Sequence, residues 1–127
     1  MQQVSGDAPQ KVNLAQKFAM FRDYFAPRIV GEVNGMHVKL ATIKGDFAWH
    51  HHEQEGELFL VVRGSLVMKL RTGDVRVNEG EFIIIPRGVE HNPCAEEECH
   101  VLLFEPASTL NTGNVRNEKT VEKPARI

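Results

Sequence analysis

Between Ile29 and Glu105 the chain is a succession of short apolar runs that are separated by turn residues. The dipeptide Asn34-Gly35 stands between two such runs and is typical of a two-residue β-hairpin. The breaks that follow are Gly45-Asp46, Arg63-Gly64, Thr72-Gly73-Asp74, Asn78-Glu79-Gly80 and Pro86-Arg87-Gly88. Because no helical period interrupts this pattern, it excludes a parallel sheet with crossover helices and predicts an all-β sandwich or barrel.

The apolar runs define the predicted strands, and one helix is predicted before them. The strands are Ile29–Val33, Met36–Ile43, Phe47–His52, Glu57–Val62, Ser65–Arg71, Val75–Val77, Glu81–Pro86, Val89–Asn92 and His100–Glu105. An apolar stripe at helical spacing is formed by Leu14, Phe18, Phe21 and Phe25. Asn13 stands at the N-cap position with Gln16 three residues later, and Pro27 ends the pattern. We therefore expect a helix over residues 13 to 26 that covers one end or face of the sheet.

The length of 127 residues is typical of one domain. We expect a tail over residues 1–12, a folded domain with its leading helix over 13–105, and an extended tail over 106–127. A formal net charge of -2 argues against a nucleic-acid binder held by bulk positive charge. No apolar run approaches the roughly 20 residues of a membrane-spanning helix.

Two further features bear on the compartment. Met1–Gln10 is polar and lacks the apolar core of a signal peptide. Cys94 and Cys99 are too few for a disulfide scaffold. We therefore expect a cytoplasmic protein in which both thiols are reduced.

The sequence holds six histidines, and His50, His51 and His52 are consecutive. Because alternate side chains of a strand share a face, His50 and His52 point one way and His51 the other. Glu57 begins the next strand, which can pair back beside them, and His91 follows a tight turn. Three imidazoles and one carboxylate suit Fe(II), Mn(II), Ni(II), Cu(II) or Zn(II) and leave open positions on a six-coordinate ion. An exposed histidine-rich loop and histidines that pack without metal remain as alternatives.

Two multi-position motifs follow one another in the central part of the chain. Residues 45–64, GDFAWHHHEQEGELFLVVRG, resemble the first cupin motif, G-x5-H-x-H-x(3,4)-E-x6-G. Residues 80–91, GEFIIIPRGVEH, resemble the second, G-x5-P-x-G-x2-H. Only four residues separate Gly45 from His50, and Ala95 stands where the family often has asparagine. The resemblance covers residues 36 to 105 and extends to small single-domain cupins described as mannose-6-phosphate-isomerase-like.

The resemblance implies a fold, a ligand set and an assembly. The implied fold is a double-stranded β-helix, a small jelly-roll cupin barrel of two antiparallel sheets, here with one N-terminal helix. The implied ligands of one divalent transition metal are His50, His52, Glu57 and His91. Similar cupins commonly dimerise through outer sheet faces, so a homodimer is implied as well.

Strand alternation predicts which other side chains share the face of these ligands. The predicted inward residues are Ala48, Phe59 and Val61. The predicted outward residues are Phe47, Trp49, His51, Leu58, Leu60 and Val62. Because Leu58, Leu60 and Val62 are apolar, their face needs a cover, either the N-terminal helix or a second subunit.

We expect the remaining polar and sulfur-containing residues to lie at the surface or in the core and not to act at the site. Lys39 shares its parity with Ala41 and Ile43, and on an inward face it would meet an anionic substrate, but we expect it to be solvated. Arg63, Arg71, Arg76 and Arg87 are expected at the surface, and Glu96–Glu98 is expected to form a solvated turn. Cys94 and Cys99 are expected to be small buried thiols.

Two classes of function fit these features. The first is a metal-dependent enzyme that acts on a small molecule, with a dioxygenase or other oxygenase favoured. A sugar isomerase or epimerase is an alternative within this class, although no Lys/Arg cluster for a sugar phosphate lies near the ligand segments. The second class is a non-catalytic sensor or storage module for a metal or small ligand, which a purely apolar pocket around a closed coordination shell would favour.

Overall fold

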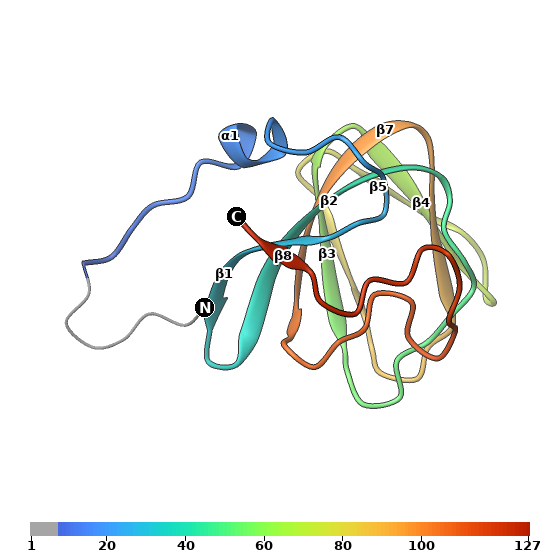
Figure 1. Ribbon diagram of the computed structural model, residues 1–127. Helices are drawn as coiled ribbons and strands as arrows, with labels where there is room; N and C mark the ends of the chain where they lie inside the picture. The colour runs from blue at the N-terminus through green and yellow to red at the C-terminus, as the bar shows by residue number, and fades with distance from the viewer. Residues whose placement is uncertain (1–7) are drawn as a thin grey trace.

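Figure 1 shows the computed structural model, which describes residues 8–127. Its elements are α1 (Leu14–Phe18), β1 (Arg28–Val33), β2 (Met36–Asp46), β3 (Glu57–Arg63), β4 (Ser65–Leu70), β5 (Val75–Asn78), β6 (Phe82–Ile85), β7 (His91–Pro106) and β8 (Ala125–Arg126). Of the tail expected over residues 1–12, residues 1–7 lie outside the described residues, and residues 8–12 are exposed without regular structure. Within residues 8–127, α1 is too short to cross a membrane.

The long strand β7 connects the two halves of the barrel. Its first residues, His91–Cys94, pair antiparallel with β4. From Cys94 onward it pairs with β2, and from His100 to Phe104 it also pairs with β3. The sheet is extended by β1 beside β2, β5 beside β4 and β6 beside β3. These strands enclose a core of buried apolar side chains, so the predicted all-β barrel is confirmed.

The β1–β2 hairpin turns at the predicted dipeptide. Asn34 and Gly35 both have positive φ, at 53° and 75°. Two consecutive left-handed residues give the type I′ turn, whose twist matches that of the strands it joins. The turn sets the register of β2, and β2 then carries that register to β7.

The predicted turn at Glu96–Glu98 is wrong, because one continuous strand replaces the two strands expected there. All three glutamates are exposed, as expected. The pairing of β7 with β2 jumps from Ile43 opposite Cys99 to Gly45 opposite Ala95. The three glutamates therefore form a bulge, which lets β7 bend from one half of the barrel to the other.

The predicted helix over 13 to 26 is much shorter, since α1 ends at Phe18. Its start is as predicted, because the Asn13 side chain accepts a hydrogen bond from the backbone N–H of Gln16 at 3.0 Å. Phe18 and Phe21 are both buried on the sheet against Leu40. The apolar spacing that predicted a longer helix is therefore equally compatible with a short helix followed by an irregular segment that packs on the sheet.

Residues 107–127 form a segment that we call the C-terminal strap. It was expected to be an extended tail, but it runs through several turns along the outside of the barrel and ends at β8 beside β1 (Figure 1, orange to red). The pairing of β8 with β1 is parallel, and the backbone N–H of Ile127 donates to the Ile29 carbonyl at 3.0 Å. The strap is therefore fixed to the barrel at its far end.

Candidate metal centre

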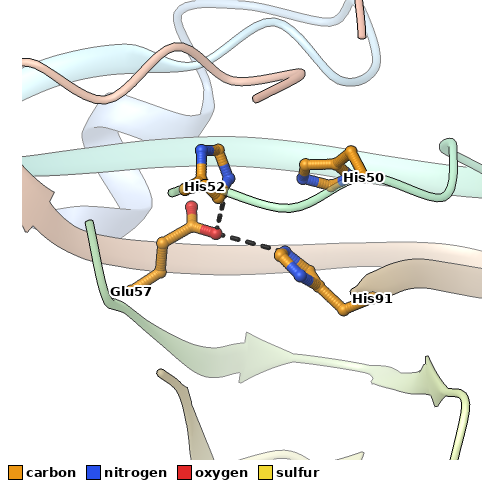
Figure 2. A group of neighbouring side chains, drawn as sticks. All are labelled: His50, His52, Glu57 and His91. Atoms are coloured by element: carbon orange, nitrogen blue, oxygen red, sulfur yellow. Dashed lines mark hydrogen bonds and ion pairs between the residues drawn. The ribbon is translucent and has the colours of Figure 1, made fainter. Parts of the chain in front are cut away.

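His50 and His52, from one segment, converge with Glu57 and His91 from two others (Figure 2). All four side chains are buried, and one nitrogen or oxygen atom from each lies within 4.8 Å of those of the others. The Glu57 Oε1 atom is 2.9 Å from His52 Nε2 and 3.2 Å from His91 Nε2. The structure thus brings together the four residues that the sequence nominated.

Backbone pairing brings the two histidine segments together. The N–H of His50 donates to the His91 carbonyl at 3.0 Å, and the N–H of His91 donates back to the His50 carbonyl at 2.9 Å. This bridge is the one regular pairing that the structure has within the predicted strand Phe47–His52, which is otherwise irregular. The N–H of Gly88 donates to the His52 carbonyl at 2.7 Å, so the tight turn before β7 supports the second histidine.

Backbone carbonyls also fix the rings of His50 and His91. The Nδ1–H of His50 donates to the Ala48 carbonyl at 2.8 Å, and that of His91 donates to the Val89 carbonyl at 2.9 Å. Each hydrogen bond turns the Nε2 atom away from the backbone, as in histidines that bind metals, and His91 Nε2 is hydrogen-bonded to Glu57 Oε1. His52 Nε2 is buried without a well-formed hydrogen bond, although it touches Glu57. Donor atoms that converge in this way, one of them without a well-formed hydrogen bond, are suited to bind a divalent ion.

Burial and neighbouring charges shift the pKa values of His50 and Glu57. Burial, with the neighbouring His91, lowers the pKa of His50 to about 4. Burial alone would raise the pKa of Glu57, but the imidazoles of His52 and His91 outweigh that effect and hold it well below its usual range. A neutral imidazole and an ionised carboxylate are the forms that coordinate metals.

His51 points away from its two neighbours, as predicted. Its side chain is 23% exposed, and its Nε2 atom lies 3.6 Å from the exposed carboxylate of Glu53. Trp49 is likewise on the outer side, where the Arg71 guanidinium lies 3.7 Å from its ring centroid. Arg71 is exposed, as are the other arginines expected at the surface, Arg63, Arg76 and Arg87.

Phe47 was predicted to face outward, and this is wrong. It is buried, stacks on Phe25 with ring centroids 5.0 Å apart, and meets the His50 ring edge-on at 5.3 Å. Residues 47–49 do not form a regular strand, so the alternation rule does not apply to them. For Glu57 the rule holds, because Phe59 and Val61 are buried with it.

Lys39 was expected to be solvated, but it is buried and paired with a residue that the sequence analysis missed. Its ammonium lies 3.2 Å from Glu105 Oε2, and both side chains are 3% exposed. Burial, reinforced by the charge of Glu57, raises the pKa of Glu105 to about 8, while Lys39 opposes the rise. The alternation of Val101, Leu103 and Glu105 along β7 was the available signal for the inward position of Glu105.

A cavity of about 50 Å³ lies beside His50 and Glu57. Its other walls are mainly apolar side chains, among them Phe25, Phe47, Phe59 and Leu103. Glu105 and Asn111 also line it. The cluster therefore faces a small space with mainly apolar walls.

The C-terminal strap holds the outer side of the segment that carries His50 and His52. Asn114 makes hydrogen bonds to both backbone groups of His51, and the Lys119 ammonium donates to the carbonyls of Asp46 and Phe47 at 3.0 Å each. Gly113 packs against the His51 carbonyl and lies close to the His50 ring. The strap therefore supplies the hydrogen-bond partners that a neighbouring strand would otherwise provide.

Comparisons with known proteins agree with this architecture. Residues 36–105 match the family model described as Cupin domain. A solved cupin-2 domain containing protein from Shewanella frigidimarina is 38% identical with a TM-score of 0.74, over 75% of this chain and 93% of that chain.

Two curated proteins are similar over part of the chain. Uncharacterized protein YdbB of Bacillus subtilis is 35% identical over 63 residues, which are 49% of this chain and 56% of that protein. A 3-hydroxyanthranilate 3,4-dioxygenase of Danio rerio is 33% identical over 66 residues, which are 49% of this chain and 22% of that enzyme. The matched region thus spans about half of the first protein and less than a quarter of the second.

Proposed function

This chain belongs to the cupin family, and on that premise we propose that it is a metal-dependent enzyme acting on a small molecule, with an oxygenase-type reaction favoured. In this proposal His50, His52, Glu57 and His91 hold one divalent transition metal. The observation that carries it is the convergence of four buried donors beside a small, mainly apolar cavity.

The chemistry follows from what the chain supplies around the ion. A divalent ion at this place supplies Lewis acidity, and a redox-active one such as iron also supplies electrons for chemistry with O2. Glu57 compensates part of its charge, while the carbonyls of Ala48 and Val89 keep two imidazoles in the coordinating form. Apolar walls exclude water and strengthen electrostatic interactions within the site. The partial similarity to a dioxygenase supports the oxygenase type of reaction.

Two alternatives differ in what they need from the cavity. A sugar-phosphate isomerase needs cations for the phosphate, and among the described residues that line the cavity there is neither arginine nor lysine. A non-catalytic binding module is favoured by the apolar lining, in which Glu105 is the ionisable side chain besides the proposed ligands. The binding module is therefore the second candidate.

Metal content and oxygen consumption separate the two candidates. The protein would be purified without an affinity tag, analysed for metal, and then loaded with Fe(II), Mn(II), Ni(II), Cu(II) or Zn(II) in turn. An enzyme of the proposed type holds one ion per chain and consumes O2 with at least one small chelating compound when loaded with iron. One ion per chain without O2 uptake across the panel would favour the binding module, and a chain that binds no ion would contradict the proposed metal-dependent enzyme.

We also propose that the chain forms a homodimer through the outer face of β3 and β6. Leu58 lies opposite Ile84 and Leu60 opposite Phe82, so these side chains share one face of the sheet. Phe82 and Ile84 are 59% and 58% exposed. A cluster of exposed apolar side chains on a sheet is typical of a protein interface. Of the two covers considered for this face, the N-terminal helix packs in one apolar cluster with Val62, and that cluster does not include Leu58 or Leu60.

A cytoplasmic location remains part of the proposal. Cys94 and Cys99 are both free and buried. Burial raises the pKa of each thiol to about 11, so both stay protonated at neutral pH. Two inert, unpaired thiols are suited to a reducing compartment.

A further inference from the structure

Phe25 forms part of the cavity wall although it lies outside the region that matches the family model. It has a left-handed backbone, with φ of 59°, which is rare for an aromatic residue. Its N–H donates to the Thr42 carbonyl at 2.9 Å, and its ring stacks on Phe47, which in turn meets His50. A strained residue that is held on both sides in this way points to a role at the site.

The polar groups of the cavity are engaged with other parts of the protein. The Oδ1 atom of Asn111 accepts from the Val121 N–H, and its Nδ2 donates to the Lys119 carbonyl, both at 2.9 Å. Glu105 faces the Lys39 ammonium, and that ammonium also lies 3.5 Å from the Thr109 carbonyl oxygen. None of the described residues that line the cavity is a lysine or an arginine, so a second anionic group on a ligand would find no cation there.

The volume of the cavity restricts the ligand further. At about 50 Å³ it holds only a few atoms, whereas drug-sized ligands occupy sites of roughly 300–1,000 Å³. A divalent ion with the Glu57 carboxylate leaves one net positive charge, which a chelator that carries one negative charge would neutralise. A second negative charge on the ligand would be buried without a partner, which is unfavourable.

We propose that the site accepts compact chelators with two oxygen donors, a single negative charge and a small apolar body, and that Phe25 limits their size. This inference rests on the proposed metal site. It makes Phe25 a specificity-determining residue, because its ring occupies the space into which a larger ligand body would extend. Sugar phosphates and other multiply charged chelators are excluded by the same walls.

Three hydroxamates with one chelating group and different bodies test the proposal. Acetohydroxamate is small and apolar, phosphonoacetohydroxamate adds an anionic group, and benzohydroxamate adds a ring. Their dissociation constants for the Co2+-loaded protein can be measured by calorimetry and by the visible absorption of the metal. We expect acetohydroxamate to bind at least tenfold more tightly than either of the others.

The variant Phe25→Gly removes the ring while glycine accepts the positive φ without strain. We expect it to bind benzohydroxamate at least tenfold more tightly than wild type does, with acetohydroxamate changed by less than threefold. Phe25→Leu, which keeps an apolar side chain, should give a smaller gain in the same direction. Phe18→Ala is the matched control, since it removes a buried ring from the other apolar cluster and should leave the order of the probes unchanged.

The outcomes separate this inference from the proposed function. A wild-type protein that binds phosphonoacetohydroxamate most tightly, or benzohydroxamate as tightly as acetohydroxamate, would overturn the inference while the metal site stands. Binding of Co2+ with no affinity for any of the three probes would do the same. A protein that binds no Co2+ would overturn the proposed function, and the inference with it.

Discussion

Asn114 makes hydrogen bonds to both backbone groups of His51. Its Oδ1 atom accepts from the His51 N–H at 2.9 Å, and its own N–H donates to the His51 carbonyl at 3.1 Å. His51 stands between His50 and His52, so this pairing fixes the backbone of both proposed ligands. The C-terminal strap thus helps to shape the candidate centre although it lies beyond the region matched by the family model.

Gly113→Ala should weaken metal binding by displacing the His51 backbone. A Cβ at this position would collide with the His51 carbonyl and lie 3.1 Å from the His50 ring. Gly80→Ala is the matched control, because Gly80 also has positive φ but nothing lies within 4 Å of its Cβ position. Both variants carry backbone strain of about 1–3 kcal/mol, and only Gly113→Ala should raise the Zn2+ dissociation constant, by tenfold or more. Equal dissociation constants for the two variants would show that the strap does not position the ligands.

Single substitutions should rank the three consecutive histidines. His50→Ala and His52→Ala each remove a proposed ligand and should leave little metal in the purified protein, as measured by elemental analysis. Glu57→Gln should do the same, because it removes the only carboxylate among the proposed ligands. His51→Ala should keep metal near the wild-type content and lower stability by no more than about 1 kcal/mol, since the side chain is partly exposed. Loss of metal in His51→Ala with retention in His52→Ala would mean that the ligand assignment is shifted by one residue.

Most of the strands could be predicted from the sequence because alternation and turn residues specify them, and the four clustered residues could be predicted because two motifs contain them. Glu57, Phe59 and Val61 alternate along the paired strand β3, and all three side chains are buried, as the alternation predicts. Phe47 was misplaced because residues 47–49 leave the regular pairing, so that alternation no longer predicts a face. No local sequence pattern indicates that these residues leave the regular strand pairing.

The other missed contacts depend on residues far apart in the sequence. Lys39 is buried only because Glu105 lies opposite its ammonium, and a lone lysine is otherwise expected at the surface. The polar composition of residues 107–127 suggests a loose tail, and only the folded chain shows that Asn114 and Lys119 bind the backbone around the histidines. Such contacts can be found only when both partners are placed in space.

Acid should destabilise the metal-free protein through His50. Burial, with the nearby His91, lowers the pKa of His50 to about 4, against about 6.5 in an unfolded chain. The unfolded state then binds the proton more tightly, so stability that is present above pH 6.5 is lost as the pH falls toward 4. Between pH 7 and pH 5 this loss is about 2 kcal/mol.

Urea denaturation of the chelator-treated wild type and His50→Gln at both pH values measures this loss. The variant lacks the titrating ring, so its free energy of unfolding should fall by about 2 kcal/mol less than that of the wild type. Equal acid sensitivity in the two proteins would show that His50 is not the group responsible.

The proposed dimer can be tested by placing a charge in its interface. Wild-type protein at micromolar concentration should sediment with the mass of two chains. Ile84→Glu places a charge in the apolar face and should give a monomer, whereas Val75→Glu, at an exposed apolar position on β5, should remain a dimer. A wild-type monomer would refute the dimer and leave the barrel unaffected.

Removal of the Lys39 ammonium should destabilise the fold more at high pH than at low pH. Burial and the charge of Glu57 raise the pKa of Glu105 to about 8, so the carboxyl is mostly ionised at pH 9 and protonated at pH 6. At pH 9 Lys39→Met removes the counter-charge that holds the pKa of Glu105 down, so the buried carboxyl must stay ionised without a partner or take up a proton, which should cost up to about 3–5 kcal/mol. At pH 6 the same variant loses little more than a hydrogen bond, about 1–3 kcal/mol. The double variant Lys39→Met/Glu105→Gln has no charge left to bury, so urea denaturation should find it more stable than Lys39→Met at pH 9. If the cost of Lys39→Met is the same at both pH values, the pair is not an ion pair in the folded protein.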